Sequence, residues 1–129
     1  MDTAPRSSRV RVSHRQIVSC VEEFLRTHLD EPVQISQLCS LTGVSERSLR
    51  NACHAVCGTS PKRLLTRRRM EAVRHALELA RPGDDTVTRI ATRYGFYELG
   101  RFAAAYCSHF GERPSQTLRA GAAAVITAA

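Results

Sequence analysis

The sequence predicts an all-α protein of about seven helices. Three observations support this fold class. Apolar residues recur at the spacing of one helical face, whereas no segment alternates between apolar and polar residues over a useful length. Serine and proline stand where helices are expected to begin, and glycine stands where they are expected to end. One helical motif also occurs twice along the chain.

The first expected helix follows an N-terminal segment without periodicity. Residues 1–12 carry proline, serine and three arginines, which is typical of a flexible lead-in or of the remnant of an interdomain linker. Ser13 and Gln16 have the spacing of a capping box, in which two side chains bind the free amides of a helix start. The helix is expected to end at 30–32, and its apolar face comprises Ile17, Val18, Val21, Phe24, Leu25 and Leu29.

Two further helices are expected before residue 60. The first covers 35–41 and is ended by Thr42-Gly43. Ser45 is placed to cap the second, which ends at Gly58. The side of this second helix that should face the core carries Leu49, Cys53 and Val56.

A long helix is expected over 61–80. Ser60-Pro61 places a capping serine before a proline at the first helical position, and Pro82-Gly83 closes the helix. Arg69 falls on the apolar side of this helix and is expected to be a buried structural partner. The apolar stripe itself consists of Met70, Val73, Leu77 and Ala80.

The remaining helices repeat the short-then-long order. A short helix is expected from Thr86 to Tyr94, and a longer one from about Glu98 to Phe110, with Gly95 and Gly111 as their stop signals. The core face of the longer helix carries Phe102, Tyr106 and Phe110. A last short helical turn is expected at Pro114-Ser115, followed by a flexible tail over 121–129.

The repeat identifies the motif. Four positions match at an offset of 52, namely Ile35, Leu38, Cys39 and Gly43 with Val87, Ile90, Ala91 and Gly95. Five match at an offset of 53, namely Leu49, Cys53, Gly58, Pro61 and Leu65 with Phe102, Tyr106, Gly111, Pro114 and Leu118. A short helix, a turn with glycine and a longer helix form a helix-turn-helix. We therefore expect one such subdomain at 35–57 and another at 87–110, within a domain over 13–120.

The exposed faces of the two longer helices carry the candidate base-contacting residues. Arginine can hydrogen-bond guanine N7 and O6 together, and asparagine can do so at adenine N6 and N7. The second helix offers fewer hydrogen-bonding groups, so this half is expected to bind mainly through the DNA backbone or to read thymine methyl groups. The candidates are Arg47, Arg50, Asn51 and His54 in the first helix, and Glu98 and Arg101 in the second.

Other residues are candidates for phosphate contacts, and the linker helix has a suitable length. The phosphate candidates are Ser45, Arg67, Arg68 and Ser108. At about 1.5 Å per residue, the helix over 61–80 would span roughly 30 Å. Because successive major-groove faces of B-DNA lie about 34 Å apart, the two longer helices can enter adjacent grooves of one duplex.

Charge and composition agree with nucleic-acid binding. The 129 residues include 19 basic and 12 acidic side chains, which gives a net charge of +7 and a pI near 9.8. All basic residues except Lys62 are arginine. Arginine suits paired hydrogen bonds to phosphate or guanine, but a GC-rich genome would raise arginine usage in the same way without functional meaning. No stretch has the roughly 20 apolar residues of a membrane span or the apolar segment of a signal peptide. The five cysteines form no CxxC pair and indicate a reduced, cytoplasmic protein.

The second motif, IATRYGFYELGRFAAAYCSHFGERPSQTLR, closely resembles the signature of the AraC/XylS family of bacterial transcription regulators in their DNA-binding domain. The shared features are a Gly-Phe turn, a mid-helix phenylalanine, an aromatic four residues later, Phe-Gly, and a proline three residues beyond. The first motif, ISQLCSLTGVSERSLRNACHAVCGTSPKRLL, is similar to the family's more variable half. The resemblance spans about Val12 to Leu118.

This resemblance implies two helix-turn-helices joined by a long helix, which bind an asymmetric promoter site in double-stranded DNA. It also implies control of transcription, most often activation through contact with RNA polymerase. By position, the family's base-reading residues fall on Arg47, Arg50 and Asn51, and on Leu99, Gly100 and Ala104. The last three cannot hydrogen-bond a base through their side chains. Most members carry an effector-binding or dimerisation domain ahead of this one, here expected on a missing N-terminal part; a complete short regulator is the alternative.

Two other classes of function are alternatives to DNA binding. An enzyme would need Cys53, His54 and Cys57 to act together, but His54 is expected to point away from the core side of the helix. Three ligands on one rigid helix also cannot converge on a zinc ion, so we expect no catalytic residue, metal or cofactor. The remaining alternative is a basic module that binds RNA or an acidic protein, for which Tyr97 is the one aromatic expected to be exposed.

Overall fold

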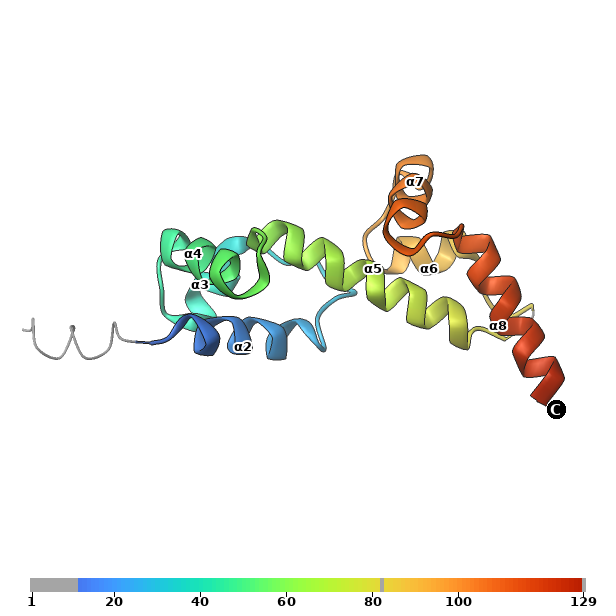
Figure 1. Cartoon of the computed structure of the whole chain (residues 1–129), viewed down its shortest axis with the longest axis horizontal. Coiled ribbons are helices and arrows are strands. Elements are labelled where there is room, and N and C mark those ends of the chain that lie inside the picture. The colour runs from blue at the N-terminus through green and yellow to red at the C-terminus, as the bar shows by residue number, and fades with distance from the viewer. Residues whose placement is uncertain (1–11, 82, 129) are drawn as a thin grey trace, which may run out of the picture. The chain divides into compact units, whose positions relative to one another are not determined.

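The computed structural model describes residues 12–81 and 83–128. All regular structure in these ranges is helical, which confirms the predicted all-α class (Figure 1). The helices are α2 (His14–Leu25), α3 (Ile35–Thr42), α4 (Glu46–Cys57), α5 (Pro61–Leu79), α6 (Val87–Arg93), α7 (Leu99–Phe110) and α8 (Pro114–Ala128). They divide into two compact units between Thr66 and Arg67, and each unit has a core of its own. Most of the expected flexible lead-in, residues 1–11, lies outside the described residues.

Helix α2 begins at the predicted capping box and ends earlier than predicted. Oγ of Ser13 accepts a hydrogen bond from the Gln16 amide at 3.1 Å, and Oε1 of Gln16 accepts one from the Ser13 amide at 2.9 Å. The helix stops at Leu25 instead of continuing to 30–32. The last carbonyls of the helix have partners other than the regular amide four residues later. The Phe24 carbonyl lies 2.7 Å from Nδ1 of His28, and the Leu25 carbonyl accepts a hydrogen bond from the His28 amide, three residues later.

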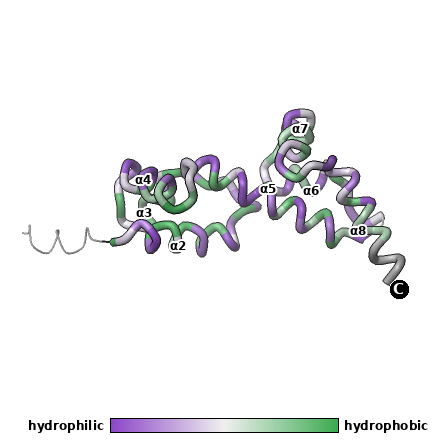
Figure 2. The backbone as a smooth tube through the Cα atoms, viewed as in Figure 1, coloured by the Kyte–Doolittle hydropathy of each residue, from purple (hydrophilic) through white to green (hydrophobic). Residues whose placement is uncertain are grey.

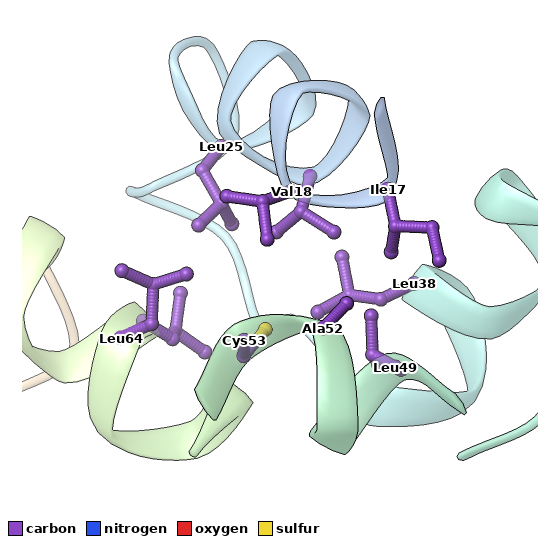
Figure 3. Packing of buried hydrophobic residues seen from close by; sticks show 10 residues of the cluster. Ile17, Val18, Leu25, Leu38, Leu49, Ala52, Cys53 and Leu64 are labelled. Atoms are coloured by element: carbon purple, nitrogen blue, oxygen red, sulfur yellow. The ribbon is translucent and has the colours of Figure 1, made fainter. Parts of the chain in front are cut away.

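The core of the first unit joins four helices. Helix α2 packs against both α3 and α4, and the first turn of α5 completes the cluster. Figure 3 shows the apolar side chains pointing into a common layer: Ile17, Val18 and Leu25 of α2, Leu38 of α3, Leu49, Ala52 and Cys53 of α4, and Leu64 of α5.

The prediction that Val56 belongs to this core is wrong. Val56 is 44% exposed, whereas Ala52 is fully buried. Val56 has nearly the same angular position as Leu49, but it lies in the last turn of α4, where Cys57 packs against the cluster instead. Angular position shows only which face a side chain is on, and burial also needs a neighbouring element to cover that position.

Helix α5 contributes to both cores. It starts as predicted, with Oγ of Ser60 accepting the Arg63 amide at 3.2 Å, and it ends at Leu79. Leu64 and Leu65 belong to the first core, whereas the predicted stripe of Met70, Val73 and Leu77 belongs to the second. Pro82, predicted to close this helix, lies outside the described residues.

The second core is built on aromatic side chains. Phe102 and Tyr106 of α7 are buried, as predicted, against α5 and α6. Ring centroids lie 5.0 Å apart for Phe96 and Phe102, 5.7 Å for Phe102 and Tyr106, and 4.7 Å for Tyr106 and Phe110. Aromatic contacts in this range stabilise the core beyond what the burial of the rings contributes. In Figure 2, hydrophobic and hydrophilic residues alternate around the helices of both units, as amphipathic helices require.

The prediction of a single short turn at Pro114-Ser115 is wrong, because α8 continues to Ala128. The residues expected to form a flexible tail, 121–129, are therefore helical as far as they are described. Alanine, which dominates this segment, has the highest helix propensity of all residues. Gly121 also lies so close to α5 that a Cβ at this position would be 2.6 Å from the carbonyl oxygen of Glu78. Helix α8 also packs against α6 and α7, and the missing side chain at Gly121 allows it to approach α5 closely.

Candidate nucleic-acid interface

The first helix-turn-helix consists of α3, the turn at Gly43 and α4. Gly43 ends α3 with a φ of 75°, a left-handed conformation that glycine adopts without steric cost. Oγ of Ser45 caps α4 by accepting the amide of Ser48 at 3.1 Å. These local signals set where α4 begins, and hence which of its side chains face away from the core.

The four predicted base-contacting residues of α4 share one exposed face. The opposite face buries Leu49, Ala52 and Cys53. An arginine and asparagine surface of this kind can donate paired hydrogen bonds to purine edges in a major groove. The exposed residues are Arg47, Arg50, Asn51 and His54.

This face also carries an ion pair that was not predicted from the sequence. Nη2 of Arg50 lies 3.1 Å from Oε2 of Glu46, and the two side chains are 51% and 63% exposed. The signal for this pair was present, because a glutamate four residues before an arginine on a helix is a favourable spacing. The pair holds the Arg50 guanidinium toward the N-terminal end of α4.

The second helix-turn-helix consists of α6, the turn at Gly95 and α7. Gly95 has a φ of 91°, and a Cβ there would lie 3.7 Å from Nη1 of Arg69 on α5. Arg69, predicted to be a buried structural partner, is half-buried and lies against this turn. Burial lowers the pKa of Arg69 below its ordinary value.

The exposed face of α7 is more apolar than that of α4. The carboxylate of Glu98 does not cap the helix and instead lies 3.7 Å from Nη2 of Arg101. Tyr97 is 75% exposed and Leu99 is 37% exposed. Such a face can contact thymine methyl groups and offers few hydrogen bonds to bases. The other predicted positions on this face, Gly100, Ala104 and Ser108, are exposed as well.

The predicted phosphate-contacting residues lie in different environments and belong to both units. Ser45 and Ser108 are exposed, but the Ser45 hydroxyl is engaged in capping α4. Arg67 and Arg68 are half-buried on α5. Nη1 of Arg68 lies 3.2 Å from Oε1 of Glu71, so this arginine has an acidic neighbour on its own helix.

The cysteine and histidine residues of α4 differ in their exposure to solvent. Cys53 is fully buried, His54 is exposed and Cys57 is half-buried. Burial raises the pKa of the Cys53 thiol to about 11, which keeps it protonated at neutral pH. Within residues 12–81 and 83–128, no group of three or more histidine, cysteine, aspartate or glutamate side chains is placed to hold a metal ion. None of the described helices is long and apolar enough to cross a membrane.

Comparison with known proteins agrees with this architecture. The family described as "Helix-turn-helix domain" matches residues 38–120. The chain is 40% identical over 103 residues to the probable thc operon regulatory protein of Rhodococcus erythropolis. The matched segment covers 80% of this chain and 31% of that protein. It is 39% identical over 99 residues to the XylDLEGF operon transcriptional activator of Pseudomonas putida. This match covers 77% of this chain and 31% of that protein. The chain thus spans about a third of the length of these relatives.

Solved structures give the same result for the fold. A probable AraC family transcriptional regulator from Rhodopseudomonas palustris CGA009 superposes with a TM-score of 0.74 at 35% identity, covering 81% of this chain and 96% of that one. The DNA-binding domain of AdpA, solved in complex with a target DNA, superposes with a TM-score of 0.66 at 21% identity, covering 81% and 90%. At this lower identity the second likeness shows the fold alone.

Proposed function

Since the chain belongs to the AraC/XylS family of transcription regulators, we propose that it binds double-stranded promoter DNA sequence-specifically and controls transcription. The exposed face of α4 carries this proposal. Arg47, Arg50, Asn51 and His54 lie on one side of a helix whose other side is buried. The major groove admits a helix of this width and presents a distinct pattern of donors and acceptors for each base pair.

In the first unit, α4 is the recognition helix of this proposal. Arg47 and Arg50 bind guanine edges, Asn51 binds adenine, and His54 extends the contact along the same face. Ser45, at the N-terminal end of α4, binds phosphate. This role suits a helix start, where free backbone amides and the helix dipole also favour anions.

In the second unit, α7 is the recognition helix, with less direct reading of bases. Arg101 and Glu98 supply the hydrogen-bonding groups, and the exposed Leu99 and Ala104 contact thymine methyl groups. Ser108, together with Arg67 and Arg68 of α5, binds phosphate and so fixes the position of the protein on the duplex. We propose that the two recognition helices occupy adjacent major grooves of one site.

The proposal also covers a further domain and the direction of regulation. Because the relatives are about three times longer than the matched segment, we propose that an effector-binding or dimerisation domain precedes this one in a complete cytoplasmic protein. The Pseudomonas putida relative is described as a transcriptional activator, and we propose activation, through contact with RNA polymerase, for this protein too.

Selection from a random duplex library at two salt concentrations tests the DNA-binding proposal. We expect the chain to enrich an asymmetric motif of two half-sites about one helical turn apart. The half-site bound by α4 should show the stronger base preference, and affinity should fall steeply with salt, because phosphate contacts release counterions.

Two outcomes would overturn the proposal. Salt-sensitive binding without an enriched motif would show a basic surface that coats DNA without reading it. Tighter binding to single-stranded RNA of matched length than to any selected duplex would favour the RNA-binding alternative. A variant in which Arg47, Arg50 and Asn51 are all alanine serves as the control, because it should lose the motif and keep its fold.

A further inference from the structure

The arginine at the centre of the α4 face already has a charged partner. Nη2 of Arg50 and Oε2 of Glu46 lie 3.1 Å apart, and the geometry fits a hydrogen bond as well as an ion pair. Glu46 lies in the first turn of α4, one turn before Arg50. Within the part of the chain that the structure describes, Glu46 and Arg50 are the ion-paired residues of α4, and Arg47 on the same face has no ion pair.

This arrangement affects the two ways in which Arg50 can meet DNA. Helical side chains lean toward the N-terminus, and in a helix-turn-helix the N-terminal residues of the recognition helix meet the base edges. A guanidinium has five N–H donors in a rigid fork, and a guanine edge uses two of them. Arg50 can therefore bind a guanine and keep one N–H on Glu46. A phosphate contact brings a second anion close to the Glu46 carboxylate, and the two anions repel each other.

We propose that Glu46 is a positioning residue that determines specificity: its carboxylate directs Arg50 to a base edge and disfavours its binding to phosphate. Glu46 thereby raises the ratio of sequence-specific to non-specific DNA binding. This inference rests on the proposed function, because it needs α4 to lie in a major groove. It assigns a role to a residue that makes no base contact of its own.

Helix α2 offers a matched control. Arg26 and Glu23 form a second exposed ion pair in the same unit, 3.3 Å apart, with side chains 68% and 71% exposed. Glu23→Gln and Glu46→Gln each remove one negative charge from the first unit, so both raise its net charge equally. Only Glu46→Gln releases an arginine on the recognition helix.

The experiment measures the affinity of the 129-residue chain for its selected duplex and for a scrambled duplex, across a series of salt concentrations. Relative to Glu23→Gln, Glu46→Gln should bind the scrambled duplex about two- to fivefold more tightly, the range expected from an exposed ion pair. Its salt dependence on that duplex should steepen by about one phosphate contact. Affinity for the selected duplex should stay level or fall, so the specificity ratio falls.

The same comparison in an Arg50→Ala background tests whether Glu46 acts through Arg50. There Glu46→Gln and Glu23→Gln should behave alike, because no guanidinium remains to be directed. A Glu46→Gln effect that persists in this background would overturn the inference, and so would equal changes on both duplexes in the wild-type background. Matching thermal melts of the two single variants exclude a folding effect. If the unsubstituted chain prefers no duplex at all, the proposed function fails as well, whereas a preference that Glu46→Gln leaves intact overturns the positioning role alone.

Discussion

The phenolic hydroxyl of Tyr106 lies 2.7 Å from Oγ1 of Thr117 and connects the second recognition helix, α7, with the first turn of α8. The Thr117 hydroxyl donates to the carboxylate of Glu112, so the Tyr106 hydroxyl is the donor to Thr117. The repeat places Cys53 and Leu64 at the equivalent positions of the first unit, and both are fully buried. The second unit therefore has a hydrogen-bonded pair where the first has two apolar core residues.

Substitutions in this pair should have unequal effects. Thr117→Val leaves the Tyr106 hydroxyl buried without its acceptor, which should lower the free energy of unfolding by about 1–3 kcal/mol. Tyr106→Phe removes the donor and leaves Thr117 bound to Glu112, so its cost should be about 1 kcal/mol. Urea unfolding of both variants measures the difference. Equal stability of the two variants would contradict the chain of hydrogen bonds.

Arg50→Ala should weaken binding to the selected DNA site by about 1–3 kcal/mol and relax the base preference at one position of it. The reason is the loss of paired hydrogen bonds to a purine edge. Arg26→Ala, directly after the last residue of α2, is the control, because it removes an exposed, ion-paired positive charge outside α4. Competition binding with all four base pairs at that position gives the readout, and a loss of affinity that is equal for every sequence would refute base reading by Arg50.

Leu49→Ala should destabilise the fold by about 2–5 kcal/mol, because Leu49 is fully buried in the first core. Val56→Ala removes an apolar side chain from the same helix, but Val56 is 44% exposed. Its cost should be well below that of Leu49→Ala. Chemical unfolding monitored by circular dichroism compares the stabilities of the two variants. A loss from Val56→Ala as large as that from Leu49→Ala would show that Val56 belongs to the core.

Gly121→Ala should lower the melting temperature, because a Cβ at this position would be 2.6 Å from the carbonyl oxygen of Glu78. Overpacking of this kind costs about 1–3 kcal/mol when backbone must move. Gly100→Ala on α7 is the opposite case, since apart from its chain neighbours and the nearby backbone of its own helix nothing lies within 4 Å of the added Cβ. There the higher helix propensity of alanine should raise stability by up to about 1 kcal/mol. Thermal melts that move in the same direction for both variants would contradict the close approach of α8 to α5.

The stability of the first unit should fall as the pH rises above 9. Burial raises the pKa of Cys53 from 9.0 to about 11, whereas the unfolded chain exposes this thiol. Between these values the unfolded state loses the proton that the folded state keeps, so stability is fully present below pH 9 and is lost as the pH approaches 11. Urea unfolding from pH 8 to 10.5 should show a shallower decline in Cys53→Ala than in the unsubstituted chain. Parallel declines would argue against a buried thiol at residue 53.

Local sequence signals predicted most of the secondary structure. The capping box at Ser13, the caps at Ser45 and Ser60, and the stop at Gly43 all depend on residues within about one turn of each other. A helix start is decided by such short-range hydrogen bonds, so the sequence contains them directly. The exposed face of α4 follows from the same helical spacing.

The sequence by itself thus determined the all-α class, the repeat of the helix-turn-helix and the polar face of α4. The tertiary structure decided that Ala52 and not Val56 is buried, and that α8 continues past Gly121. It also decided that the Tyr106 hydroxyl forms a hydrogen bond with Thr117, eleven positions away. These features depend on which element covers which position, and a periodic pattern within one helix carries no record of its neighbours.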